Sequence, residues 1–342
     1  MNKDEILSLG YSNEFINKTK GVYLVTNYSD ELLYQKINAV YYCLKGIGFS
    51  HNDIINITSN YPGIFIYDSE TIREKISDYV ELGFTRNEIK KMIRSCPKII
   101  SIGLKNVNGK INFLIELKFS RDEIMKMIKI APSLLIYSIK IMKQKINDLQ
   151  ELGYSYDQVL KMIRNSSVIF GYSMDSIKQK INHLIELGYT YDEVITMTVK
   201  FSALLGYDTG NIDKKIDDLL LLGYTKEQIK YMTIVLPSIF GLSIDNIREK
   251  KEFYDSIGIG DILIKRPSML IQGIELSYAR YMFYKSNGIE INENNHLLLF
   301  CLQDRFKKKY GKSNKELMEE FNYNKYLEEK KCEFVIRKKI SC

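Results

Sequence analysis

The chain has 342 residues, of which 45% are hydrophobic and 27% are charged, and its formal net charge is +7. No apolar run approaches the roughly 18 residues that a membrane-spanning helix requires. The N-terminus lacks both the apolar core of a signal peptide and the Arg- and Ser-rich character of a transit peptide. These features exclude an integral membrane protein and predict a cytoplasmic one. Five scattered cysteines without a CxxC pair argue against a disulfide framework or a structural zinc site.

A short phrase recurs along the chain at a fixed interval. It reads ELGFTRNEI from Glu81, ELGYSYDQV from Glu151 and ELGYTYDEV from Glu186, so the last two copies lie 186 − 151 = 35 residues apart. The glycine of the phrase recurs in the same register, with Lys118 in one of the places: Gly48, Gly83, Gly153, Gly188, Gly223 and Gly258. All five prolines share one repeat position, allowing for a shortened last copy: Pro62, Pro97, Pro132, Pro237 and Pro267. This periodicity predicts an array of repeated units.

The repeats divide the chain into three predicted parts. Residues 1–46 hold one copy of the phrase out of register and are predicted to form a degenerate N-terminal repeat or cap. Residues 47–275 form the repeat array. Residues 276–342 contain a degenerate last repeat and two basic segments, RFKKKYGK (305–312) and IRKK (336–339). Apolar residues between these segments predict helices that close the end of the array.

Each repeat is predicted to fold as helix, short turn, helix. Gly153 suits the left-handed residue that ends a helix, and Ser155 with Gln158 predicts the capping box of a first helix of about ten residues. The proline position, as at Pro132, suits the first residue of a short helical turn. A second cap, such as Ser173, then begins a second helix with its apolar residues on one face.

These units predict the fold class. None of them buries its apolar face alone, so neighbouring repeats must stack. No strand-like alternation of apolar and polar residues occurs between the predicted caps. The predicted fold is therefore all-α, an α-solenoid superhelix of about seven to eight helix–short turn–helix repeats in one continuous array.

The repeat resembles that of the mitochondrial transcription termination factor (mTERF) family. The resemblance rests on the pattern LG-aromatic-S/T-x-x-E/Q-I/V, followed by Pro-x-Ile/Leu-Leu and I-x-x-K-I-x-x-L, over residues 47–275. It implies three-helix units whose groove holds nucleic acid, usually double-stranded DNA, and a non-enzymatic role in transcription, replication or RNA processing. The chain departs from the pattern at Lys118, Ser167 and Ser202 and carries no organelle address. Its Ile-, Lys- and Asn-rich composition favours a bacterial or phage member of the family.

One position of the second helix carries a lysine in six consecutive repeats, hereafter the row lysines: Lys75, Lys110, Lys145, Lys180, Lys215 and Lys250. Companion cations stand two residues earlier in four repeats: Arg73, Lys143, Lys178 and Arg248. A recurring glutamate, such as Glu151, follows six residues after the lysine and lies about 120° away around the helix. Stacking would align the ten cations along the phosphates of a duplex, so we predict them as nucleic-acid-binding residues. The alternative for any single lysine is that its methylene groups cover the edge of the core.

Other charged and aromatic residues have simpler structural explanations. Cations near the end of the first helix, in the pairs Lys91 and Arg94, Lys126 and Lys129, and Lys161 and Arg164, favour the helix dipole. A basic patch over residues 91–164 is the alternative. Most of the 25 tyrosines occupy repeat positions, so packing explains them better than base stacking does. Outside the tail that begins at Asp304, 37 basic residues face 35 acidic ones, so binding requires cations sorted onto one surface.

No catalytic constellation is present. The histidines (His51, His183 and His296) stand far apart, and no phosphate-binding loop, GxSxG or dinucleotide motif occurs. We therefore predict a protein that is not an enzyme, with no catalytic residue, metal, cofactor or small-molecule substrate. The alternative to binding duplex DNA is a solenoid scaffold that holds a protein or peptide, and RNA binding is a further alternative.

Overall fold

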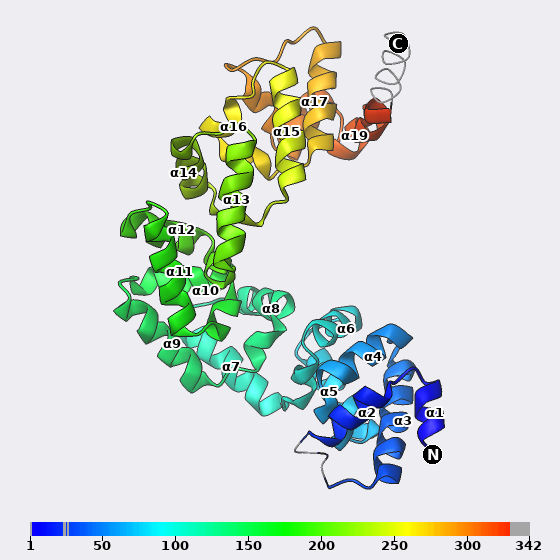
Figure 1. The fold of residues 1–342 in the computed structure, drawn as a ribbon. Coiled ribbons are helices and arrows are strands. Elements are labelled where there is room, and N and C mark those ends of the chain that lie inside the picture. The colour runs from blue at the N-terminus through cyan, green and yellow to red at the C-terminus, as the bar shows by residue number, and fades with distance from the viewer. Residues whose placement is uncertain (1, 23–24, 26, 329–342) are drawn as a thin grey trace, which may run out of the picture. The chain divides into compact units, whose positions relative to one another are not determined.

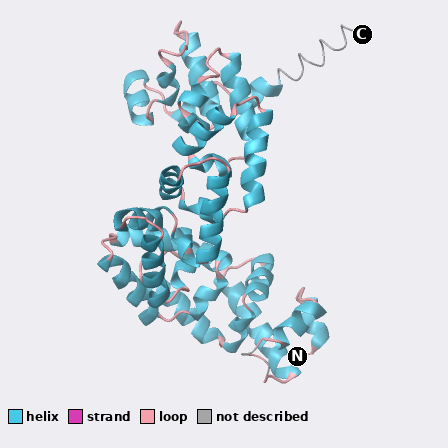
Figure 2. Ribbon diagram, turned by 60° about the vertical axis from the view of Figure 1, so that its left-hand side comes forward, coloured by secondary structure: helices cyan, strands magenta, loops and turns pink. Residues whose placement is uncertain are grey.

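The computed structural model describes residues 2–22, 25 and 27–328, and this part of the chain folds into α-helices and short 3-10 helices (Figure 1). Figure 2 shows helices joined by loops, and the described residues contain no strand. No helix among them combines the length and the apolar content needed to cross a bilayer. The all-α solenoid predicted from the repeats is confirmed.

The helices follow one another in the order that the repeats predict. The N-terminal helices are α1 (Lys3–Ser8), α2 (Asn13–Lys20) and α3 (Asp30–Ile47). The first helices of the repeats are α4 (His51–Asn60), α6 (Arg86–Ser95), α8 (Arg121–Ile130), α10 (Tyr156–Asn165), α12 (Tyr191–Lys200), α14 (Lys226–Val235) and the short α16 (Ile262–Lys265). The 3-10 turns are η1 (Pro62–Ile66), η2 (Pro97–Ser101), η3 (Pro132–Leu135), η4 (Ser167–Gly171), η5 (Ser202–Gly206), η6 (Pro237–Gly241) and η7 (Pro267–Leu270). The second helices are α5 (Ser69–Glu81), α7 (Leu104–Glu116), α9 (Ile139–Glu151), α11 (Met174–Glu186), α13 (Thr209–Leu221), α15 (Ile244–Ser256) and α17 (Ile274–Ser286). The C-terminal part adds η8 (His296–Phe300), α18 (Gln303–Tyr310) and α19 (Asn314–Glu320).

Side-chain caps determine where the first helices α4 to α14 begin, whereas Asp261 before α16 makes no side-chain cap. At α8, Ser120 Oγ accepts a hydrogen bond from the Glu123 N–H at 3.3 Å, and Glu123 Oε2 accepts one from the Ser120 N–H at 2.8 Å. This reciprocal pair satisfies N–H groups that have no partner at the start of a helix. The capping box predicted at Ser155/Gln158 is confirmed, and four further first helices begin with the same box: Ser50/Asp53, Thr85/Glu88, Thr190/Glu193 and Thr225/Gln228.

A 3-10 turn follows each first helix and contributes to the core. Each of the five prolines begins such a turn, as predicted, and Ser167 and Ser202 begin η4 and η5 in the same place. Leu134 and Leu135 of η3 are fully buried, as are Ile128 of α8 and Met142 of α9. All three elements of the repeat therefore bury apolar side chains, which explains why neighbouring repeats stack.

Lys118 is the one residue other than glycine with a positive φ among the described residues, at 68°. It stands where Gly83 and Gly153 end the helices of the neighbouring repeats, with φ of 102° and 92°. A side chain in this left-handed conformation costs about 1–2 kcal/mol, because its Cβ approaches the following carbonyl oxygen. Lys118 therefore takes the glycine conformation at a cost in stability.

We expect the Lys118→Gly substitution to stabilise the protein by about 0.5–1 kcal/mol. The free energy gained by removing the left-handed strain exceeds the free-energy cost of the extra conformational entropy that glycine gives the unfolded chain. Urea unfolding followed by circular dichroism measures the change. The reciprocal substitution Gly153→Lys is the control and should destabilise the protein by a similar amount. A less stable Lys118→Gly variant would contradict the explanation.

The chain divides into two compact units, Met1–Met174 and Asp175–Cys342. The division falls at the start of α11, so α1 to α10 belong to the first unit and α12 to α19 to the second. Both units are built from the same repeat. The predicted parts 1–46, 47–275 and 276–342 follow the repeat sequence instead, and this division stays a prediction.

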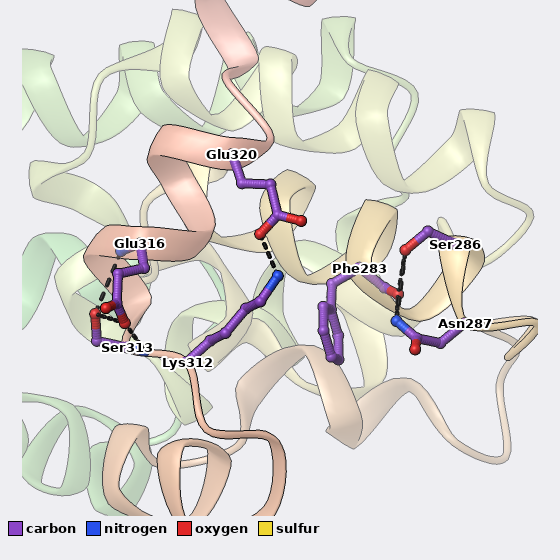
Figure 3. Close-up of polar contacts among 7 residues, drawn as sticks. All are labelled: Phe283, Ser286, Asn287, Lys312, Ser313, Glu316 and Glu320. Atoms are coloured by element: carbon purple, nitrogen blue, oxygen red, sulfur yellow. Dashed lines mark hydrogen bonds and ion pairs between the residues drawn. The ribbon is translucent and has the colours of Figure 1, made fainter.

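The basic tail begins with α18 and α19, which belong to the second unit and pack against α17. Phe306 of α18 is buried, and its ring centroid lies 5.3 Å from that of Phe283 in α17. Lys312 pairs with Glu320 at 2.5 Å, and its Nζ lies 5.7 Å from the centroid of the Phe283 ring (Figure 3). These contacts anchor α18 and α19 on α17. The second basic segment, 336–339, lies outside the described residues.

Candidate nucleic-acid interface

The row lysines lie on the second helices, but most of their side chains point into the protein. Lys110, Lys145, Lys180 and Lys250 are buried, with exposed fractions of 7%, 6%, 5% and 2%. Lys75 and Lys215 are half-buried. The sequence predicted a ladder of ammonium groups along the wall of a groove, and the structure instead places most of the row at the edge of the core.

Four row lysines donate a hydrogen bond to a carbonyl oxygen at the end of the next 3-10 turn. Lys110 donates to Leu135 O and Lys145 to Tyr172 O. Lys215 donates to Leu242 O and Lys250 to Leu270 O, each at 2.5 Å between Nζ and the oxygen. These four row lysines therefore link the second helix of one repeat to the turn of the next.

The chemistry of a helix end explains this position. Carbonyl groups in the last turn of a helix have no partner within that helix, and they favour a cation. The methylene groups of each lysine cover the core on the way to the carbonyl. Burial lowers the pKa of Lys110, Lys145 and Lys250. Phosphate contact by the row lysines stays a prediction, and their ammonium groups already have protein acceptors in four repeats.

Arg280 continues the row and was missed by the sequence analysis. It stands 288 − 280 = 8 residues before Gly288, as Lys250 stands 258 − 250 = 8 residues before Gly258. Its exposed fraction is 1%, and its Nη1 donates to Leu299 O at 2.9 Å, near the end of η8. The shortened last repeat breaks the 35-residue interval, so only counting back from the glycine would have found it.

The companion cations are exposed, as a binding role requires, but they do not form a continuous row. Arg73, Lys143, Lys178 and Arg248 lie on α5, α9, α11 and α15. Helix α7 lies between α5 and α9 in the repeat order and carries Asn108 at this position. Helix α13 lies between α11 and α15 and carries Asp213 there. Arg248 also pairs with Asp245 at 2.6 Å.

In each of the three cation pairs near the ends of α6, α8 and α10, the second cation forms an ion pair with the preceding repeat. Arg94 binds both carboxylate oxygens of Asp53, at 2.7 and 2.8 Å, and lowers the pKa of Asp53 to about 2. The equivalent pairs are Lys129 with Glu88 at 3.0 Å and Arg164 with Glu123 at 2.8 Å. In each case the acid is the third residue of the first helix in the preceding repeat and belongs to its capping box. These pairs neutralise Arg94, Lys129 and Arg164.

The remaining cations of this row are three lysines one turn earlier, hereafter the first-helix lysines: Lys91, Lys126 and Lys161. They lie on α6, α8 and α10, all three are exposed, and none forms an ion pair or hydrogen bond within the described part of the chain. The ion pairs beside them hold these helices next to one another. The first unit therefore exposes uncompensated cations on the first helices of three successive repeats.

Most of the chain matches a known protein family. The family model described as mTERF matches residues 28–118, 104–220 and 144–307. The three matches overlap and together cover residues 28–307, which is most of the chain. The comparison with curated proteins gives no match.

Proposed function

The chain belongs to the mTERF family, a family of nucleic-acid-binding repeat proteins, and we propose that it binds double-stranded DNA without catalysing a reaction. The proposed contacts are ion pairs between exposed lysine and arginine side chains and backbone phosphates. Such contacts position a duplex but read no base sequence. Control of transcription at the bound duplex is the further part of this proposal.

The observation that carries the proposal is the set of first-helix lysines, Lys91, Lys126 and Lys161, which are exposed and have no acidic partner among the described residues. Packed helices lie about 10 Å apart, so the three ammonium groups span about 20 Å. One turn of duplex DNA is about 34 Å long, so a single turn accommodates all three. This surface corresponds to the patch over residues 91–164 that the sequence left as an alternative.

The four companion cations are a second candidate surface. They are exposed on the second helices, as the predicted interface requires: Arg73, Lys143, Lys178 and Arg248. Their distribution favours a supporting role, because Asn108 and Asp213 interrupt them and Asp245 neutralises Arg248. In this proposal the row lysines hold the second helices in place, and the phosphate contacts are assigned to the exposed cations.

The test is a titration of the full chain with duplex DNA, single-stranded DNA and RNA of equal length at several salt concentrations. We expect the duplex to bind most tightly, and the logarithm of its affinity to fall linearly with the logarithm of salt concentration. Tighter binding of RNA would show that the exposed cations bind RNA and not duplex DNA. Absence of binding to all three, or an affinity independent of salt, would refute the proposal.

A further inference from the structure

A cleft of about 480 Å³ lies in the first unit between the end of α3, one face of α5 and α6. The three helices are labelled in Figure 1. Its apolar walls include Ile47, Ile76, Val80 and Ile89. The volume lies within the range of about 300–1,000 Å³ that is usual for small-molecule sites. The cleft is therefore large enough for a ligand, and the repeats show why it opens at this place.

Two side chains are smaller here than at the same repeat positions elsewhere. Gly46 stands two residues before the helix-ending glycine, where the next four repeats carry a glutamate: Glu81, Glu116, Glu151 and Glu186. Ser77 stands where the following three repeats carry an asparagine: Asn112, Asn147 and Asn182. A Cβ placed on Gly46 meets no atom within 4 Å. The missing side chains leave the space open and remove a negative charge.

The charged residues that line the cleft are mostly basic. Arg73 and Arg86 are exposed, and neither forms a hydrogen bond or ion pair within the described residues. Lys90 has one long contact, 3.5 Å from its Nζ to Gly48 O. Glu74 is the single acid among the lining residues. With three cations and one acid, the lining residues carry a net charge of +2 beside the apolar wall.

We propose that this cleft binds a small phosphate monoester with an apolar body. The head group of such a ligand carries up to two negative charges at neutral pH, which match the two uncompensated positive charges. Guanidinium groups bind phosphate oxygens through paired hydrogen bonds, so Arg73 and Arg86 are the expected phosphate ligands. The apolar body lies against Ile47, Ile76 and Val80. This inference does not depend on nucleic-acid binding.

The test is isothermal titration of the full chain with octyl phosphate, inorganic phosphate and 1-octanol. Octyl phosphate carries both features of the proposed ligand, and each of the other probes carries one. We expect octyl phosphate to bind at least tenfold more tightly than either of them, because only this probe meets both the cations and the apolar wall. Equal affinity for all three probes, or no binding of octyl phosphate, would overturn the proposal.

Gly46→Glu is the decisive variant, because it restores the residue of the neighbouring repeats. Glutamate favours a helix more than glycine does, and its Cβ meets no atom within 4 Å, so the variant should fold, which circular dichroism checks. We expect Gly46→Glu, Arg73→Ala and Arg86→Ala each to weaken octyl phosphate binding at least tenfold. Lys143→Ala is the matched control, since Lys143 occupies the position of Arg73 two repeats later, and it should leave the affinity unchanged.

Two results of this series would contradict the assignment. One is unchanged octyl phosphate affinity in a folded Gly46→Glu variant, and the other is an equal loss in Lys143→Ala. A duplex DNA titration of the same Gly46→Glu variant separates this proposal from the proposed function. Duplex binding that persists while octyl phosphate binding is lost supports the cleft, and a wild-type protein that binds octyl phosphate but no duplex refutes the DNA proposal alone.

Discussion

Replacement of Lys145 by glutamate is expected to lower the free energy of unfolding by about 3–5 kcal/mol. The side chain is 6% exposed and its ammonium group donates to Tyr172 O, so a carboxylate there would be buried against a carbonyl oxygen with no donor. Lys145→Met removes the donor without adding a charge and should cost about 1–3 kcal/mol. Urea unfolding followed by circular dichroism measures both variants.

Lys143→Glu is the matched control for this prediction. Lys143 lies two residues earlier on α9 and is exposed, so its charge reversal should change the stability by no more than about 0.5 kcal/mol. Equal stability of the Lys145→Glu and Lys143→Glu variants would show that Lys145 has no structural role. In that case the row lysines would again become candidates for direct phosphate contact, as the sequence predicted.

The second large expected effect concerns the first-helix lysines. Replacing Lys91, Lys126 and Lys161 together by glutamine should weaken duplex binding and reduce the slope of log affinity against log salt by about 3. Each lysine that neutralises one phosphate contributes about 0.9 to this slope, because it releases counterions condensed on the DNA. The stability should change little, since the three side chains are exposed and contact no acid within the described chain.

A triple variant of equal charge change separates a local contact from the effect of net charge. Lys307, Lys308 and Lys309 are exposed on α18, and their replacement by glutamine removes the same three charges. This control should leave the salt slope within experimental error of the wild type. If both triple variants lose affinity equally, the first-helix lysines act only through net charge, and the interface lies elsewhere. The set Arg73, Lys143, Lys178 and Arg248 is then the next to be replaced.

Local features of the fold could be read from the sequence because short-range interactions determine them. A serine and a glutamate three residues apart complete a capping box with only the first turn of a helix present, as at Ser120 and Glu123. Proline at the start of a turn and glycine after a helix reflect the backbone angles of single residues. Lys118 shows that the position in the repeat determines the backbone conformation more strongly than the residue type does, since Lys118 adopts the glycine conformation with φ of 68°.

The side-chain directions of the candidate site could not be read in the same way. A lysine beside the apolar stripe of a helix, such as Lys145, is equally suited to cover the core edge or to extend into solvent. The choice depends on Tyr172 O, which lies 27 residues later and reaches Lys145 only when the next repeat is in place. The same holds for Arg94 and Asp53, which are 41 residues apart.

The sequence by itself therefore determined the all-α repeat, the helix starts and the positions at which cations recur. Those features depend on hydrogen bonds and backbone angles within a few residues of each other. Only the tertiary structure decided which cations are used internally and which remain exposed. Stacking places the unpaired carbonyl groups and the capping acids of one repeat next to the lysines and arginines of another. The cations that contact these groups form hydrogen bonds or ion pairs with them, and the other cations remain exposed.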